Sequence, residues 1–455
     1  MEEKKSNSLT DVLERMMRFY APKFGLANFL TIEEMKHETI KRKNLGTLVL
    51  TNVIPMYRSN VGNSNEEYRS GCGASLSKEK SQVKALGEFI ERYSATNGHG
   101  DHPLSLHYNT YPEQCKLGDC LDPMELIDFE DSAYDVEGVF FTRYTHDRMV
   151  SWVQGTELTS GKPAWVPAQK AFLGIPFENG EGAYVQGLST GVACGSSVDG
   201  ATISGILEVV ERDSFMLTWL LKLPGKKIIM DGAEDSELMK LYRHICSHLV
   251  GDDSLHIYDI SRIDGVYTVL TFFRNDNPES YGLVTAAASD TDPEHALLKS
   301  LEELCLSQAF AYAKLFSSPT YPDEIKSWTM EDVRTLHLHF FYYGTGSRSY
   351  EFDFISESQE SVRLSEMPNY TAGMNEHERL FYLSALFRSQ GLRVYAVDLT
   401  RPEVAECGLA VVSAIIPGFN DLDVCHRFRL LNNQRLREFQ KRFNRPIRKA
   451  PHPFP

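Results

Sequence analysis

Two short stretches of the chain carry the same reactive side chains at the same spacing. The segment Glu88-Phe-Ile-Glu-Arg92 recurs further along as Glu208-Val-Val-Glu-Arg212, so each copy has two carboxylates and one guanidinium. Carboxylates three positions apart lie about one helical turn from each other and repel. If the two helices face each other, four carboxylates converge, and Mg²⁺ is the usual occupant of such a cluster where phosphates also bind. The two guanidinium groups would then suit phosphate oxygens. The pattern therefore predicts a metal site at Glu88, Glu91, Glu208 and Glu211, with Arg92 and Arg212 beside it.

Both stretches also repeat an apolar stripe at helical spacing. The stripe consists of Val83, Leu86 and Ile90 in the first copy and of Ile203, Ile206 and Val210 in the second. Each helix should therefore bury the same face and present the same charged face. The competing interpretation is two ordinary amphipathic helices whose charged faces are solvated.

A segment rich in small residues precedes each of these helices. The first is Gly71-Cys-Gly-Ala-Ser and the second is Ser189-Thr-Gly-Val-Ala-Cys-Gly-Ser-Ser. Such loops allow backbone N–H groups to approach an anion at a helix N-terminus. No Gly-Lys-Ser/Thr follows, so neither is a Walker A loop, and a purely structural tight turn remains the alternative.

The elements that must position these residues alternate between helices and strands, which predicts a mixed α/β (α+β) fold. We expect long helices from about residue 74, over about 200–222 and over about 293–315, and a shorter one near Ser8 or Thr10. We expect a basic helix over about 428–443. Expected strands are the runs at 45–54, 138–144, 266–273, 283–288, 392–399 and 409–416.

Composition narrows the class of protein. The 455 residues carry a formal net charge of −15, so bulk attraction to nucleic acid is not expected. No stretch reaches the length of a membrane span, and the charged N-terminus is unlike a secretory signal. The eight cysteines show no CxxC spacing. We therefore predict a cytoplasmic protein that binds neither membrane nor nucleic acid.

Together these residues resemble the YcaO family. The resemblance rests on the two repeated blocks with their preceding loops and on Gly282-Leu-Val-Thr-Ala-Ala-Ala with the helix bearing Glu302 and Glu303. It continues through Asp398-Leu-Thr and Ile416-Pro-Gly-Phe to the end, Pro451-His-Pro-Phe-Pro455. It implies internally repeated helix–sheet units around an ATP cleft. The expected organisation is an N-terminal segment, 1–65, packed on a YcaO domain, 66–455.

The resemblance also implies a chemistry. Family members use ATP and Mg²⁺ to phosphorylate a backbone amide oxygen of a peptide, which turns a poor leaving group into a good one. By this resemblance Glu88, Glu91, Glu208 and Glu211 serve the metal, and Arg92, Ser196 and Arg212 serve ATP.

The PxPxP end resembles that of the azoline-forming branch, in which a Cys, Ser or Thr side chain attacks the preceding carbonyl. Alternating prolines stiffen the tail, and the carboxylate of Pro455 is predicted to act as a base. A frayed terminus is the competing interpretation.

Four positions depart from the family pattern. Cys72 stands where Lys is frequent, Lys84 where Ser is frequent, Ser196 where Asn is usual, and Gly200 where a metal-binding Glu is typical. These departures bear on metal occupancy and on whether the chain turns over ATP.

The expected function is therefore an ATP-dependent cyclodehydratase component that forms thiazoline or oxazoline rings in a ribosomally made precursor peptide. Two alternatives remain: a docking scaffold with little ATP turnover, and a thioamide-forming relative. The region before the repeated blocks is short, so we expect a separate E1-like, leader-binding partner protein. A flavin dehydrogenase and a homodimer are further possible partners.

Overall fold

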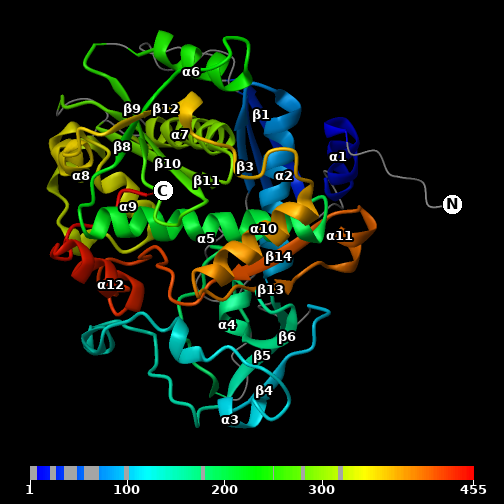
Figure 1. Cartoon of the computed structure of the whole chain (residues 1–455). Helices are drawn as coiled ribbons and strands as arrows, with labels where there is room; N and C mark the ends of the chain where they lie inside the picture. The colour runs from blue at the N-terminus through cyan, green and yellow to red at the C-terminus, as the bar shows by residue number, and fades with distance from the viewer. Residues whose placement is uncertain are drawn as a thin grey trace.

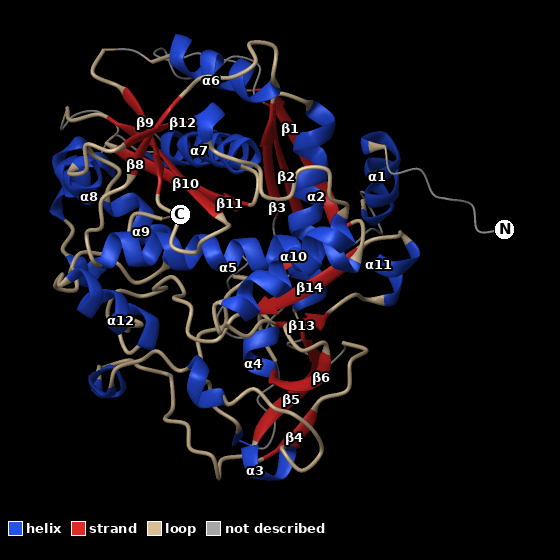
Figure 2. Ribbon diagram, viewed as in Figure 1, coloured by secondary structure: helices blue, strands red, loops and turns tan. Residues whose placement is uncertain are grey.

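The computed structural model describes residues 8–20, 27–34, 49–55, 71–96, 102–175, 180–249, 251–277, 282–315 and 321–454. Its strands form three sheets, with helices between them (Figure 2). This arrangement confirms the mixed α/β class. Among these residues, no helix has both the length and the apolar character needed to cross a bilayer.

The first sheet is antiparallel and has three strands, β1 (Ala27–Glu34), β2 (Val49–Pro55) and β3 (Gly71–Ser75). The helix α1 (Leu9–Met16) begins at Ser8, whose side chain caps it by accepting from the Asp11 N–H. Met16 and Phe19 are buried in one cluster with the helix that follows β3. The boundary near residue 65 stays a prediction.

The second sheet has the strand order β11-β10-β9-β8-β12. Its strands are β8 (Lys226–Ile229), β9 (Ser254–Asp259), β10 (Tyr267–Arg274), β11 (Leu283–Asp290) and β12 (Ser361–Arg363). Neighbouring strands are antiparallel except β12, which runs parallel to β8.

The third sheet has the order β4-β5-β13-β14-β7, with β6 paired to β5. Its strands are β4 (His107–Asn109), β5 (Val150–Glu157), β6 (Lys162–Pro167), β7 (Val192–Gly195), β13 (Tyr395–Asp398) and β14 (Ala410–Ile415).

Three long helices each follow a strand: the first comes after β3, the second after β7 and the third after β11. They are α2 (Lys78–Ala95), α5 (Val198–Leu220) and α7 (Pro293–Leu315), as the sequence predicted. Ser77 caps α2 and Ser197 caps α5, since each side chain accepts a backbone N–H of the first turn. The helix α5 runs across the middle of the molecule (Figure 1), and most of its residues are buried.

The remaining helices lie around this frame. They are α3 (Tyr111–Gln114), α4 (Ala168–Ala171), α6 (Glu237–Ser247), α8 (Tyr321–Ser327), α9 (Leu336–Tyr342), α10 (Glu376–Ser389), α11 (Pro402–Glu406) and α12 (Gln434–Phe443).

Two predicted elements differ from the structure. The run 138–144 is a loop, not a strand, because its aromatic residues find apolar neighbours without a β-ladder: Phe141 and Tyr144 are buried in two separate clusters. The basic helix begins at Gln434 rather than near 428. The preceding backbone N–H groups are taken by other acceptors, since Leu430 donates to an Asp423 carboxylate oxygen and Asn432 to the Asp128 carbonyl.

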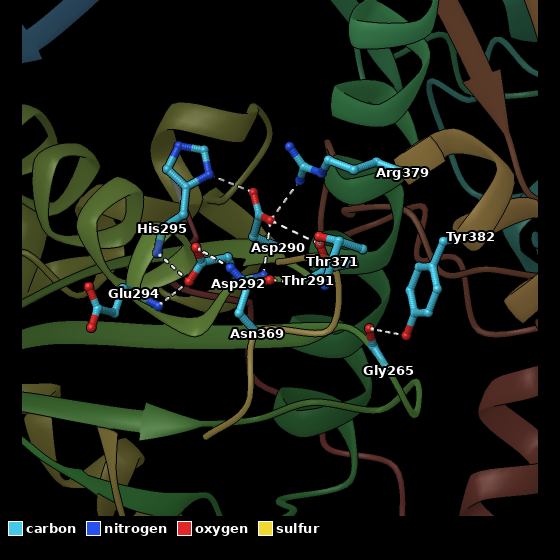
Figure 3. A network of polar contacts seen from close by, with 10 residues as sticks. All are labelled: Gly265, Asp290, Thr291, Asp292, Glu294, His295, Asn369, Thr371, Arg379 and Tyr382. Carbon is cyan, nitrogen blue, oxygen red and sulfur yellow. Dashed lines mark hydrogen bonds and ion pairs between the residues drawn. The ribbon is translucent and has the colours of Figure 1, made fainter. Parts of the chain in front are cut away.

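The helix α10 is attached to the end of β11 by one buried carboxylate. Figure 3 shows His295 and Arg379 both pointing at Asp290, with hydrogen bonds of 2.7 and 2.9 Å to its two oxygens. Burial acts to raise the pKa of Asp290. The hydrogen bond from His295 and the charges of Lys299 and Arg379 outweigh this effect, so the pKa is lowered to about 2. The carboxylate is therefore ionised and holds α10, β11 and the start of α7 together.

Candidate functional site

The two repeated blocks make the same contacts atom for atom. Glu88 Oε2 accepts the backbone N–H of Cys72 at 2.5 Å, and Glu208 Oε2 accepts that of Gly191 at 2.9 Å. The other oxygen of each carboxylate accepts a terminal guanidinium N–H, from Arg92 to Glu88 and from Arg212 to Glu208. The sequence repeat is therefore a structural repeat in which the preceding segment and an arginine one turn on fix a helix glutamate.

Glycine is needed in both preceding segments because the backbone approaches a neighbouring chain segment closely. A Cβ on Gly71 would lie 2.0 Å from the Ala85 carbonyl oxygen of α2. A Cβ on Gly191 would lie 2.1 Å from the Ala414 carbonyl oxygen, and φ is +87° there. The small-residue segments thus serve close packing, and their N–H groups bind the chain's own carboxylates.

The charged faces of α2 and α5 converge on each other. Burial raises the pKa of Glu91 well above its ordinary value, and the charges of Glu208 and Glu88 add to this rise. Since Glu208 belongs to α5 and Glu88 to α2, the two blocks lie within electrostatic reach. The interpretation of two solvated faces is wrong, because the side chains of Glu208 and Arg212 are only 26% and 18% exposed.

The second carboxylate of the α5 block is also buried. Burial raises the pKa of Glu211, Arg212 offsets part of the rise, and Glu303 and Glu208 add to it. The Nε of Arg212 lies 3.6 Å from Glu211 Oε1. The site therefore concentrates negative charge that its own arginines neutralise only in part.

The third long helix contributes residues that the repeat alone did not predict. Lys84 forms an ion pair of 2.5 Å with Glu302 on α7, whose other oxygen accepts the Ser75 hydroxyl at 2.9 Å. The charges of Arg212, Lys84 and Lys299 lower the pKa of Glu303, although burial dominates and the net shift is upward. In the sequence, the adjacent pair Glu302-Glu303 indicated that this helix contributes to the site. The helix α7 follows β11 and bears carboxylates, so it repeats the strand–helix unit of α2 and α5.

The residues present fit a divalent ion with a bound phosphate chain. Glu211 Oε1 and Arg212 Nη1 are buried without a hydrogen-bond partner among the described residues. Within the same part of the chain, no three His, Cys, Asp or Glu side chains are placed to hold a metal by themselves. Mg²⁺ at nucleotide sites takes one or two carboxylates and completes its shell with phosphates and water, so a three-residue cage is not required.

The C-terminal tail enters this site and is not frayed. Its last described residues lie in the interior beside α9 and α5 (Figure 1), and Phe454 is 2% exposed. The carbonyl of Pro451 accepts the Tyr343 hydroxyl at 2.6 Å, and that of Pro453 accepts the Thr285 hydroxyl at 2.8 Å. The ring of Phe454 lies against Arg212, with its centroid 4.3 Å from the guanidinium carbon. Pro455, predicted as the base, lies outside the described residues, so its role stays a prediction.

Ser196 is separated from the carboxylate cluster. It is exposed and precedes the N-cap of α5, whereas Glu208 lies about 15 Å further along that helix. A Cβ at Gly200 would lie 2.8 Å from Glu376 Oε1 at the start of α10, which is the end of an exposed side chain. The thiol of Cys72 stays protonated at neutral pH, since burial and Glu88 raise its pKa to about 11.

Comparison with known proteins identifies relatives of this arrangement. Residues 71–420 match the family described as YcaO cyclodehydratase, ATP- and Mg²⁺-binding. An uncharacterized protein of Methanothermobacter thermautotrophicus is 25% identical over 357 residues, which are 78% of this chain and 82% of that one.

Three solved structures share the fold. A heterocyclase in complex with substrate and cofactor has a TM-score of 0.75 at 18% identity; the match covers 100% of this chain but only 58% of that one. YcaO from Methanopyrus kandleri, bound with AMPPCP and Mg²⁺, has a TM-score of 0.59 at 20% identity, covering 87% of this chain and 86% of that one. The E. coli microcin synthetase McbBCD complex with pro-MccB17 bound has a TM-score of 0.56 at 16% identity, covering 94% and 96%.

The match over residues 71–420 includes both glutamate–arginine blocks and the α7 carboxylates. The chain belongs to the YcaO family, whose cofactors are ATP and Mg²⁺.

Proposed function

We propose that this chain is the ATP-using component of a peptide cyclodehydratase, which forms thiazoline or oxazoline rings in a ribosomally made precursor. The observation that carries the proposal is the duplicated contact in which Glu88 and Glu208 are each held by a backbone N–H and an arginine. Such a preorganised arrangement suits the transfer of a phosphoryl group, where catalysis is mostly positioning and charge stabilisation.

The reaction balances as follows. A substrate Cys, Ser or Thr side chain loses its proton and attacks the preceding carbonyl carbon, which leaves an oxyanion. That oxygen takes the γ-phosphoryl group of ATP, and ADP departs. The amide nitrogen then loses its proton, a C=N bond forms, and phosphate leaves with the former amide oxygen.

The chain's own residues have distinct roles in this proposal. Glu88, Glu91, Glu208 and Glu211 would supply the carboxylates for Mg²⁺, one or two to each ion, and the ion would shield the negative charge of the triphosphate. Arg212 keeps Nη1 free of protein partners among the described residues and is directed by Phe454. Arg92 is the matching donor on α2, and Ser196 would contact the nucleotide from the start of α5. The Pro455 carboxylate would accept the proton of the attacking side chain.

The choice of branch is supported by the buried tail. Tyr343 and Thr285 hold the carbonyls of Pro451 and Pro453, and this directs the end of the chain toward the carboxylate cluster. The McbBCD complex has pro-MccB17 bound, and the heterocyclase is in complex with its substrate and cofactor. We infer that this chain likewise needs a precursor peptide and a leader-binding, E1-like partner.

The test is product analysis with the full chain, its partner and its precursor. The proposal predicts ATP-dependent phosphate release and a precursor that loses the mass of one water for each ring. A gain in mass from exchange of oxygen for sulfur would show the thioamide alternative. Rings that form without ATP hydrolysis, or with undiminished yield in Glu208→Gln, would instead support the scaffold alternative.

A further inference from the structure

Three imidazole rings meet in the interior where the C-terminal tail is anchored. They belong to His339 on α9, His426 in the segment between β14 and α12, and His452 in the tail. The rings of His339 and His452 are stacked with centroids 4.0 Å apart, and His426 lies 6.2 Å from His339. Three histidines from three distant segments thus form one cluster, which joins the C-terminal tail to α9 and to the segment before α12.

Few polar groups satisfy these rings. His339, His426 and His452 are 0%, 9% and 1% exposed. Both ring nitrogens of His339 and the Nδ1 atoms of the other two are buried without a hydrogen-bond partner among the described residues. His452 Nε2 lies 3.0 Å from the Asp423 carbonyl oxygen. A buried imidazolium with so few acceptors is costly, so the packed cluster requires neutral rings.

Burial and the neighbouring charged groups together disfavour a positive charge on the cluster, and Asp423 and the backbone contacts of the rings oppose this only in part. Burial and the other two imidazoles hold the pKa of His339 well below its ordinary value. Burial and Arg429 lower the pKa of His426 to about 4, although Asp423 opposes this. Burial, Arg429 and Arg212 lower that of His452 to about 3, against its bond to the Asp423 carbonyl. Asp423 does not supply a free countercharge, because it is paired with Arg429 at 3.3 Å.

The cluster lies on the path to the active-site arginine. His452 stands two residues before Phe454, whose ring covers Arg212 and also meets Phe215 edge to face at 4.5 Å. If His452 leaves its place against His339, the Pro453 carbonyl and the Phe454 ring cannot both keep their contacts. Arg212 would then lose the ring that fixes it.

We propose that His339, His426 and His452 are positioning residues that latch the C-terminal tail onto Arg212, and that the latch holds only while all three rings are neutral. This rests on the proposed function for the part that concerns Arg212, but the latch itself does not.

The direction of the pH dependence follows from linkage. Each ring binds a proton more readily in the released tail than in the packed one. The latch is therefore fully stable above the ordinary histidine pKa, about 6.5, and weakens as pH falls from there toward 4. Each histidine contributes at most about a tenfold weakening per pH unit in that range.

The experiment measures amide hydrogen exchange of the C-terminal peptide, 444–454, in the full chain between pH 8 and pH 5.5, corrected for the intrinsic pH dependence. In wild type, the protection of these amides from exchange should be constant from pH 8 to 7 and should fall by at least about tenfold by pH 5.5. His339→Phe keeps a flat ring against His452 without a titrating nitrogen, so its loss should be smaller. His256→Phe is the matched control: burial lowers the pKa of His256 to about 4 as well, but it stacks on Phe272 in the second sheet. That variant should respond like wild type.

A second measurement separates the latch from its role at Arg212. The affinity for AMPPCP with Mg²⁺ should fall in parallel with tail protection in wild type and less steeply in His339→Phe. Unchanged protection between pH 8 and 5.5, or equal responses of wild type and His339→Phe, would overturn the latch. Loss of protection without loss of nucleotide affinity would overturn the positioning of Arg212. A chain that binds no nucleotide at pH 8 while its tail still responds would refute the proposed function and leave only the latch.

Discussion

At the scale of single residues, the site depends on glutamates whose orientation is fixed by two donors each. A backbone N–H holds one carboxylate oxygen and an arginine holds the other, in both repeats. This fixation lowers the cost of gathering like charges before a cation and a phosphate chain arrive. The same residues were named from spacing alone, because glutamates three apart with an arginine next to the second define one face of a helix. Their donors were not predictable, since Cys72 and Gly191 donate through the backbone.

Replacement of either fixed glutamate by glutamine should disable phosphoryl transfer. We expect Glu88→Gln and Glu208→Gln each to lower kcat for phosphate release by about 10²-fold, the usual loss for one preorganised charged group. Glu79→Gln is the control, since Glu79 is exposed in the first turn of the same helix as Glu88. Activity in either site variant equal to that of the control would contradict the assigned roles.

The ring of Phe454 should matter through Arg212. A cation–π contact at a desolvated site is worth about 1–2 kcal/mol, so Phe454→Ala should weaken nucleotide binding by roughly tenfold. Phe454→Tyr keeps the aromatic face and should restore most of that affinity, whereas Phe454→Leu keeps only bulk. Titration calorimetry with AMPPCP and Mg²⁺ makes the comparison, and a leucine variant as good as tyrosine would show that bulk alone is sufficient.

At the scale of elements, the site is assembled by short-range packing of strands on helices. β3 lies so close to α2 that Gly71 admits no side chain, and Gly191 lies equally close to β14. The sequence showed these glycines but not their role. An anion-binding loop and a backbone segment packed closely on its neighbour have the same glycine-rich sequence. The long helices were predictable because their apolar stripes are periodic. The strand predicted at 138–144 is wrong because its aromatic residues do not alternate in burial: Phe141 and Tyr144 are buried, whereas Phe140 is exposed.

Two glycine substitutions on adjacent elements should change the free energy of unfolding in opposite directions. Gly71→Ala places a Cβ 2.0 Å from the Ala85 carbonyl oxygen and should lower the free energy of unfolding by about 3 kcal/mol or more. Gly87→Ala, within α2, meets only Met16 at 3.8 Å and should raise it by about 0.5–1 kcal/mol. Chemical denaturation measures both, and a stabilising Gly71→Ala would show that β3 does not press on α2.

The attachment of α10 should have a recognisable acid response. Because the pKa of Asp290 is lowered to about 2 from 3.8, its contribution is fully present above pH 4 and is lost as pH falls toward 2. Asp290→Asn should therefore cost about 2 kcal/mol at pH 7. The gap between variant and wild type should close below pH 4, as thermal denaturation across this range would reveal. A gap that stays constant down to pH 2 would contradict the role of the ionised carboxylate.

At the scale of the whole molecule, three carboxylate-bearing helices and a buried tail meet at one site. The mixed fold, the family and its cofactors could be predicted from the sequence, because the two repeated blocks are specific. The resemblance also included the helix that bears Glu302 and Glu303, but the contacts of α7 in the site and the histidine cluster could not be predicted. Lys84 meets Glu302, and His339 meets His452, only through contacts between segments far apart in the chain.

The proposed function requires that Glu88 and Glu208 build one site for Mg²⁺ and ATP. Calorimetric titration of AMPPCP, with and without Mg²⁺, into wild type and the double variant Glu88→Gln, Glu208→Gln tests it most directly. We expect Mg²⁺-dependent binding in wild type that weakens by about 10²-fold or more in the double variant. Binding that is independent of Mg²⁺, or equal affinity in the two proteins, would contradict it.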